Sequence, residues 1–464
     1  MLTINIIRAP GAKDLYLQLY EGIKQMIIAR DIQPGEKLPS KKKLATHLKV
    51  SVKTVENAYF QLMLEGYIYS REKVGFFASN IDGFYTAKPV PQPSYTNRYT
   101  ETTYRLDIKA NKTPLEMFPL SVWNRIGREV MSDHGTDLLA TVPFNGITDL
   151  RVAIARHLQE FRGMRVSPDQ VVVGSGTEFL YNRILALLGP NSVIGMEDPG
   201  FAHIRKILET AGTPHTSIEV DEQGIRVDLL AESDATAVHV SPMHHFPLGI
   251  TMPVQRRVEL LQWVNDAPGR FIIEDDYNCE YLYHGSPVPP LYSLDVRKKV
   301  IYLNTFSKTV APGIRMAYMV LPEELMERYL ETLSFYSCTV PSSIQYQMAR
   351  FMRDGHFERH IHRVRQHNIE QRKLVCDAIA ASPLADRVRV RRNPAGTHFL
   401  LELDTNTSDA QIERALFEQE ILAGFASDYC ELPNPALDHL LVLNYSRITA
   451  ADMDLLIDAL TQAL

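Results

Sequence analysis

The chain has 464 residues, more than one hydrophobic core usually supports, which predicts roughly two to four domains. Its 45% hydrophobic and 22% charged residues are typical of a soluble globular protein, and we find no run of 18 uncharged apolar residues that would predict a membrane span. Residues 1–79 carry 12 basic and 7 acidic side chains, a net +5, whereas the remainder carries 37 and 48, a net −11. We therefore expect only the N-terminal part to meet a polyanion.

The first residues and the cysteines indicate a cytoplasmic protein. Residues 1–5 show no basic segment before an apolar core, so no signal peptide is expected. The four cysteines are far apart and lack the spacing of metal ligands, which predicts reduced thiols that serve mainly in packing. They are Cys279, Cys338, Cys376 and Cys430.

Residues 10–79 predict a winged helix-turn-helix. Apolar residues at helical spacing predict an amphipathic helix from Asp14 to Ala29, a short helix from Lys41 to Leu48 and a longer helix from Val52 to Glu65. Two short apolar runs around a charged turn, residues 67–77, predict a β-hairpin after them. The short turn between the second and third helices is typical of the helix-turn-helix.

The third helix of such a domain enters the major groove of DNA by its N-terminal end. Serines that suit helix N-caps precede both the second and the third helix, where backbone N–H groups and lysines can meet phosphate. The predicted DNA-binding residues of the two helix starts and of the hairpin are Ser40, Lys42, Ser51, Lys53, Thr54, Asn57, Lys73 and Gly75.

Four segments of this domain, residues 38–45, 50–55, 58–59 and 65–67, resemble the GntR class of bacterial repressors. The resemblance implies binding to a double-stranded DNA operator. GntR proteins commonly have arginine directly after the serine of the recognition turn, where this chain has Val52, so the base preference does not follow. The alternative is a small helical domain with solvated lysines.

Residues 80–112 change in character. Pro89, Pro91 and Pro93 lie among small polar residues without any period, which predicts a semi-extended linker.

Residues 113–464 alternate apolar runs with helical stretches, which predicts an α/β domain whose parallel sheet is covered on both faces. The predicted strands are residues 171–173, 193–195, 237–240, 271–273, 300–303 and 316–320. Residues 341–464 follow the order helix, strand, helix, strand, helix, which predicts a smaller C-terminal α+β lobe.

One strand end, residues 301–315, presents a lysine between apolar flanks. A lysine held near an interior has a lowered pKa and can form a Schiff base with an aldehyde, most often that of pyridoxal phosphate (PLP). Thr305, Ser307 and Arg315 supply groups that suit the phosphate of PLP, and Lys308 would bind its aldehyde. The alternative is a plain strand and loop.

Three other strand ends carry groups that suit the same ligand, because ligands of such sheets bind beyond the strand ends. Ser175, Gly176 and Thr177 join a strand to a helix and could hold a phosphate, although an ordinary glycine turn has the same pattern. Asp275 could keep a pyridine nitrogen protonated, with Tyr277 on the same side, although a solvated acidic strand end is the alternative. Phe201 offers a ring for stacking.

Together these segments resemble the PLP site of fold-type I aminotransferases over nearly all of residues 113–464. The resemblance implies that Ser175, Gly176, Thr177 and Arg315 bind the phosphate, Phe201 stacks on the ring, Asp275 meets the pyridine nitrogen, Tyr277 meets the 3′-oxygen, and Lys308 forms the aldimine. A GntR-like domain before such a body resembles the MocR/GabR family of PLP-dependent transcriptional regulators. That family implies sensing of PLP or an amino compound by homodimers, often arranged head-to-tail.

The chain departs from aminotransferases where they bind substrate. Phe246 stands where they usually carry asparagine, and the last strand, residues 440–445, lacks their carboxylate-binding arginine. His203 stands where the GABA-sensing regulator has arginine. The candidates for effector binding are therefore His203 and Arg447, the latter just past the strand.

We predict a PLP-binding transcriptional regulator that does not turn over a substrate and whose main effector is not GABA. A working aminotransferase with an accessory DNA-binding domain is the alternative, and an α/β scaffold without PLP is a third.

Overall fold

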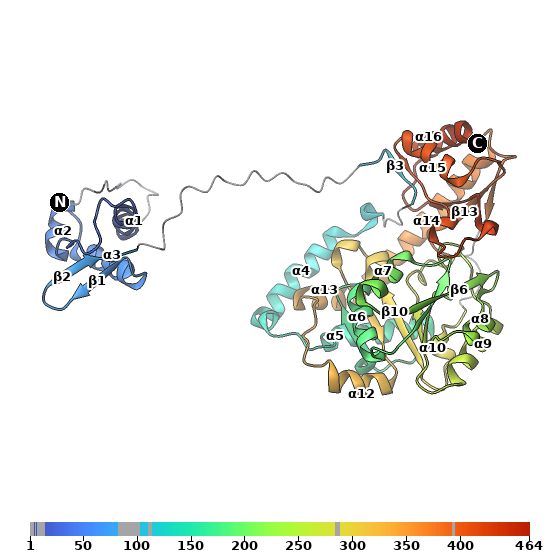
Figure 1. The fold of residues 1–464 in the computed structure, drawn as a ribbon, viewed down its shortest axis with the longest axis horizontal. Coiled ribbons are helices and arrows are strands. Elements are labelled where there is room, and N and C mark those ends of the chain that lie inside the picture. The colour runs from blue at the N-terminus through green and yellow to red at the C-terminus, as the bar shows by residue number, and fades with distance from the viewer. Residues whose placement is uncertain are drawn as a thin grey trace. The chain divides into compact units, whose positions relative to one another are not determined.

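The computed structural model describes residues 4, 6, 14–81, 103–109, 114–283, 288–391 and 395–464. It forms two compact units, here called the head (Met1–Glu101) and the body (Thr102–Leu464) (Figure 1). Most of the predicted linker, residues 80–112, lies outside the described residues. Among the residues that the structure describes, no helix is both long and apolar enough to cross a membrane.

The head is three helices and a hairpin, as the sequence predicts. Its elements are α1 (Leu15–Ile28), α2 (Lys41–Leu48), α3 (Val52–Leu64), β1 (Ile68–Arg71) and β2 (Gly75–Ala78). The two strands pair in antiparallel register from Ile68 opposite Ala78 to Arg71 opposite Gly75. Buried apolar residues from every one of these elements make up a single core.

Local signals set the ends of the head helices. The Ser40 hydroxyl accepts the backbone N–H of Lys43, and the Ser51 hydroxyl accepts that of Thr54, so each serine caps the helix that follows it. Lys49 ends α2 in the left-handed conformation. These contacts explain why the predicted bounds of α2 and α3 agree with the structure to within a residue.

The body is built on an eight-stranded sheet with the order β4-β11-β10-β9-β8-β5-β6-β7. Its strands are β4 (Val171–Gly174), β5 (Ile194–Asp198), β6 (His215–Asp221), β7 (Gly224–Ile225), β8 (Ala237–Val240), β9 (Phe271–Asp275), β10 (Val300–Thr305) and β11 (Ala317–Val320). The prediction of a parallel sheet is wrong for β11, which is antiparallel to β4 and β10, and for β7, which is antiparallel to β6. Apolar runs mark a buried strand, but they do not encode its direction.

Helices cover both faces of the sheet, as predicted. One face packs on α6 (Thr177–Leu188), α7 (Ala202–Ala211) and α12 (Glu323–Thr332). The other packs on α4 (Leu120–His134), α5 (Thr148–Arg162), α8 (Val227–Glu232), α9 (Val254–Asn265) and α13 (Ser342–Arg353). Shorter helices are η1 (Leu115–Met117), η2 (Gly135–Leu139), η3 (Pro168–Gln170), α10 (Leu291–Leu294), α11 (Phe306–Thr309) and η4 (Pro312–Ile314).

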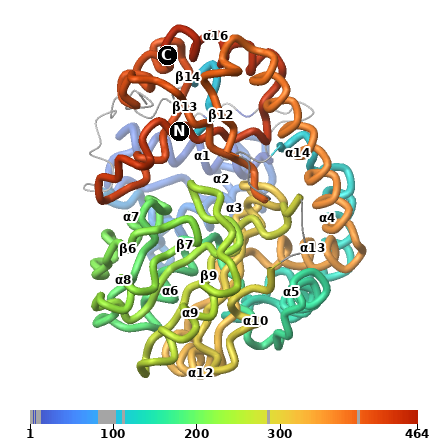
Figure 2. The backbone as a smooth tube through the Cα atoms, turned by 90° about the vertical axis from the view of Figure 1, so that its right-hand side faces the viewer, coloured from blue at the N-terminus to red at the C-terminus, as the bar shows by residue number. Residues whose placement is uncertain are grey.

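The long helix α14 (His356–Ala380) joins the sheet domain to a small lobe (Figure 2). The lobe has a three-stranded sheet in the order β12-β13-β15 and a pair of β14 with β3. Its elements are β3 (Leu106–Asp107), β12 (Val388–Arg391), β13 (His398–Leu403), α15 (Asp409–Glu418), β14 (Ile421–Leu422), η5 (Ala426–Tyr429), η6 (Pro435–Leu437), β15 (Leu440–Asn444) and α16 (Ala450–Ala463).

Two predicted boundaries in the body are wrong. Residues 106–108, assigned to the linker, belong to the small lobe, because β3 pairs with β14 and Leu106 and Ile108 enter the lobe's core. The lobe also does not begin at 341: α13 packs in the core of the large sheet, and α14 contributes Phe357 to that core and Val375 to the lobe. The division therefore falls within α14.

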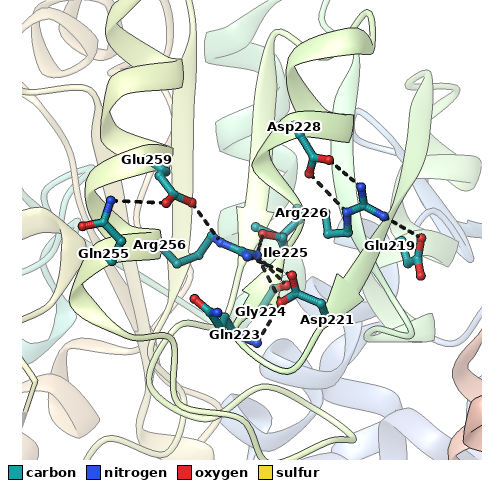
Figure 3. A network of polar contacts seen from close by, with 10 residues as sticks. All are labelled: Glu219, Asp221, Gln223, Gly224, Ile225, Arg226, Asp228, Gln255, Arg256 and Glu259. Carbon is teal, nitrogen blue, oxygen red and sulfur yellow. Dashed lines mark hydrogen bonds and ion pairs between the residues drawn. The ribbon is translucent and has the colours of Figure 1, made fainter.

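A polar network fastens the β6–β7 hairpin to α9 (Figure 3). The guanidinium of Arg256 donates to the carboxylate of Asp221 at 2.8 Å and to the Ile225 carbonyl at 2.6 Å. Its Nε lies 3.1 Å from Glu259 on the same helix. These contacts stabilise the β6–β7 hairpin, which lies at the edge of the sheet and has few neighbouring strands.

Candidate functional site

Most of the predicted ligand residues come to one edge of the large sheet. Leu303 of β10 pairs with Asp275 at the end of β9. Because β11 runs the other way, its first residue, Ala317, pairs both with Thr305 at the end of β10 and with Gly174 at the end of β4. Three points of the chain therefore lie side by side: the end of β4 before Ser175, the end of β10 before Lys308, and the start of β11 after Arg315.

Lys308 lies in the one-turn helix α11, directly after β10. The Thr305 hydroxyl caps this turn by accepting the N–H of Ser307 at 3.2 Å, and Tyr281 donates its hydroxyl to the Lys308 carbonyl at 3.1 Å. The side chain is half-buried, and burial lowers the pKa of its amine. A larger fraction of the amine is then neutral and nucleophilic near pH 7 than for a solvated lysine.

The turn Ser175–Thr177 opens α6 and requires glycine at its centre. Gly176 has φ +120°, and a Cβ atom there would lie 2.7 Å from both Arg315 Nη2 and Glu178 Oε2. The bare backbone and the helix N-terminus together suit a phosphate. The Ser175 N–H donates to Thr339 Oγ1 at 3.2 Å, which places Thr339, a residue the sequence did not indicate, against the turn.

The structure brings Arg315 and His203 together through Glu178, which the sequence analysis also missed. Arg315 donates to Glu178 Oε2 at 3.0 Å and to the Ser175 carbonyl at 3.4 Å, and His203 Nε2 lies 3.5 Å from Glu178 Oε1. Although burial raises the pKa of the Glu178 carboxyl, its backbone N–H and Arg315 together lower it below the ordinary value. Arg315 and His203 thus share one carboxylate.

The predicted ring contacts lie at the ends of β9 and β5. The Tyr277 hydroxyl donates to the His244 carbonyl at 3.0 Å, and its ring packs edge-on against Phe201. Phe201 stacks on Phe246 with ring centroids 4.8 Å apart. Asp275 Oδ2 lies 3.7 Å from His239 Nε2.

Two buried groups beside Asp275 were missed. Glu197 of β5 accepts the Ser241 N–H at 3.0 Å, and burial raises the pKa of its carboxyl to about 8. His239 lies within the apolar strand β8. A carboxylate or imidazole inside an otherwise apolar run was the available signal, because such groups are rarely buried without a purpose.

Arg447 is exposed in the turn after β15. Among the described residues, no hydrogen bond or ion pair joins it to the other candidates. Asn444, at the end of that strand, donates to the carbonyls of Ile108 at 3.2 Å and Lys109 at 2.8 Å. Asn444 therefore holds the residues that follow β3 against the end of β15.

The candidate DNA surface lies on the head. Ser40, Lys42, Ser51, Lys53, Asn57 and Lys73 are exposed, and Thr54 and Gly75 are half-buried. Glu56 lies among the lysines, 2.9 Å from Lys41 Nζ and 3.3 Å from Lys53 Nζ, and these contacts lower the pKa of its carboxyl.

Comparisons with known proteins agree with this architecture. Residues 107–460 match the family of class I and II aminotransferases, and residues 15–78 match the gntR family of bacterial regulatory proteins. The chain is 36% identical to the uncharacterized HTH-type transcriptional regulator YdeL of Bacillus subtilis, over 84% of each chain. It is 30% identical to the HTH-type pyridoxine biosynthesis transcriptional regulator PdxR of Corynebacterium glutamicum, over 83% of each. Among solved structures, the Pyrococcus horikoshii kynurenine aminotransferase has a TM-score of 0.68 at 21% identity, over 78% of this chain and 92% of that one.

Proposed function

Because this chain belongs to the class I and II aminotransferase family and joins that body to a GntR-family head, as MocR/GabR-type regulators do, we propose that it is a transcriptional regulator that holds PLP on Lys308 and responds to PLP or an amino compound. The observation that carries the proposal is the convergence at one sheet edge of Lys308, Asp275 and the turn Ser175–Thr177.

The residues at this edge fit PLP. The Lys308 amine would attack the aldehyde and release water, the turn and Arg315 would hold the phosphate, and Asp275 would face the pyridine nitrogen. Gly176 has φ +120°, a backbone conformation that other residues rarely adopt, as expected where backbone N–H groups turn toward an anion. PLP supplies an aldehyde that captures amines and a ring that withdraws electrons.

Regulation is favoured over transamination by the absence of a carboxylate clamp. Turnover of an amino acid requires its carboxylate to be fixed, and a misplaced substrate can cost on the order of 10²-fold in rate. The last strand, β15, carries no arginine, and the amide of Asn444 at its end donates to the Ile108 and Lys109 carbonyls. Phe246 stands in the asparagine position and packs against Phe201.

PLP itself, or an amine with a second group other than a carboxylate, is the effector that these residues suit best. His203 is a weaker anion partner than arginine and already lies beside Glu178, which makes GABA a poor match. Arg447 is exposed and, among the described residues, has no hydrogen bond or ion pair with the other candidates. The relative PdxR is named as a regulator of pyridoxine biosynthesis, which is consistent with PLP as the signal.

The active form in this proposal is a homodimer in a head-to-tail arrangement that binds its operator in the cytoplasm. On α4 and η2 of the body, Leu120, Met131 and Leu139 expose 59%, 63% and 86% of their surface. Apolar side chains at such exposure suit contact with a second copy. Light scattering should give twice the 52.7 kDa chain mass.

The test of the regulatory function is DNA binding that depends on ligand. Duplexes selected from a random library by the full chain should bind it at nanomolar concentration, and PLP or an amine should change that affinity. Deleting residues 1–79 should abolish binding but leave PLP uptake intact. Operator binding by the truncated body would overturn the assignment of the head, and rapid amino-group transfer from an amino-acid panel would favour the aminotransferase.

A further inference from the structure

A histidine lies beneath the strand end that carries Asp275. His239 of β8 pairs with Met196 of β5 on one side and with Ile273 of β9 on the other. Asp275 follows Ile273 by two residues, so the alternation of side chains places it on the same face as His239, one level closer to the ligand edge. The 3.7 Å between His239 Nε2 and Asp275 Oδ2 is an ion-pair distance.

The ring of His239 is buried, with 1% of its surface exposed, and its edge packs against the ring of Tyr181 on α6. Its Nε2 has no hydrogen-bond partner among the described residues. A buried polar nitrogen is costly unless it is paired, so its retention inside an apolar strand indicates a purpose. Asp275 is the anion that lies within reach of it.

Three further titratable groups surround this pair. Burial raises the pKa of the Glu197 carboxyl to about 8 and lowers the pKa of His245 to about 3, so both are neutral at pH 7. Burial also raises the pKa of the Tyr181 hydroxyl, which is neutral as well. Asp275 is thus the carboxyl group that faces the His239 ring at ion-pair distance.

We infer that His239 is a positioning residue for Asp275. Its Nε2 faces Oδ2 at 3.7 Å, so an N–H there attracts this carboxylate oxygen and leaves the other oxygen for the ligand edge. The inference rests on the proposed function, in which Asp275 faces the pyridine nitrogen of bound PLP. A carboxylate held in that position would keep the nitrogen protonated, and a positively charged ring would disfavour a proton on the nitrogen that links the cofactor to Lys308.

The test compares two side chains of similar length in the full-length protein. His239→Met removes the donor, whereas His239→Gln keeps an amide N–H. We expect His239→Met to weaken PLP binding by about tenfold, the loss typical of one hydrogen bond to a charged group, and to raise the pH midpoint of the visible absorbance band of the bound cofactor. His239→Gln should stay near wild type in both. In an Asp275→Ala background, His239→Met should have no further effect on the midpoint.

His157→Leu is the matched control, because His157 is also buried but packs between Phe161 and Phe357, and it should leave the midpoint unchanged. If His239→Met loses its circular-dichroism spectrum, His239→Asn, which is too short to reach Asp275, replaces it. A midpoint unchanged in a folded variant without a donor overturns the inference. Wild-type protein with no visible band at all instead overturns the proposed function.

Discussion

The buried ion pair between Arg162 and Asp276 gives a large and testable stability prediction. Arg162 Nη2 lies 2.8 Å from Asp276 Oδ2, and the side chains expose 2% and 1% of their surface. Tyr302 donates its hydroxyl to the same oxygen at 2.8 Å. Arg162→Met removes the cation from a buried carboxyl group and leaves that hydroxyl as its remaining bond to Oδ2, so we expect the free energy of unfolding to fall by about 3–5 kcal/mol.

Urea unfolding followed by tryptophan fluorescence measures this loss in the body alone, because both tryptophans, Trp123 and Trp263, are buried there. Arg156→Met is the control on the same helix: Arg156 pairs with Glu160 in solvent, with 67% and 58% of the side chains exposed, so its loss should change stability little. Adding Asp276→Asn to Arg162→Met should recover part of the stability. A loss for Arg162→Met no larger than that of the control would refute the reasoning.

Three further predictions follow from the charged groups. Glu56→Gln frees Lys41 and Lys53 from their ion pairs, so DNA affinity should rise. The slope of log K against log salt concentration should become steeper by up to about one released counterion. An unchanged slope would mean that these lysines do not contact phosphate. The pKa of the Glu197 carboxyl is raised to about 8 in the folded state, so this group favours folding at low pH and favours it less as pH rises. Glu197→Gln should therefore flatten the fall in the free energy of unfolding between pH 6.5 and 8 by up to about 1.4 kcal/mol per pH unit. An equal dependence of stability on pH in both proteins would contradict the burial argument. Arg256→Met should accelerate amide exchange in the β6–β7 hairpin (Figure 3) but not in β10, whereas uniform acceleration would mean global destabilisation.

The sequence was sufficient where structure is set by neighbouring residues. Ser40 and Ser51 cap the helices that follow them through contacts three residues away, so the head could be predicted almost to the residue. Six strands of the large sheet were also found, because runs such as residues 171–173 are buried on both faces, whereas β6 and β7 were missed. The residues around Lys308 could be placed at one edge because strand ends of such sheets meet there.

What the sequence did not reveal depends on distant pairing. The two residues of β3 pair with β14, more than 300 positions later, and carry no period of their own. The direction of β11 and the place of α13 in the large core likewise depend on packing. Side-chain partners were hidden for the same reason: nothing near Glu178 in sequence indicates that it lies between Arg315 and His203.

The most direct test of the account is chemical capture of the cofactor. The purified chain should be loaded with PLP, reduced with borohydride, digested and sequenced by mass spectrometry. We predict one modified peptide, with the phosphopyridoxyl group on Lys308, because burial lowers the pKa of that amine. Lys308→Ala should lose both the label and the visible absorbance. Label on another lysine, or no label in wild-type protein that has taken up PLP, would contradict the assignment of Lys308.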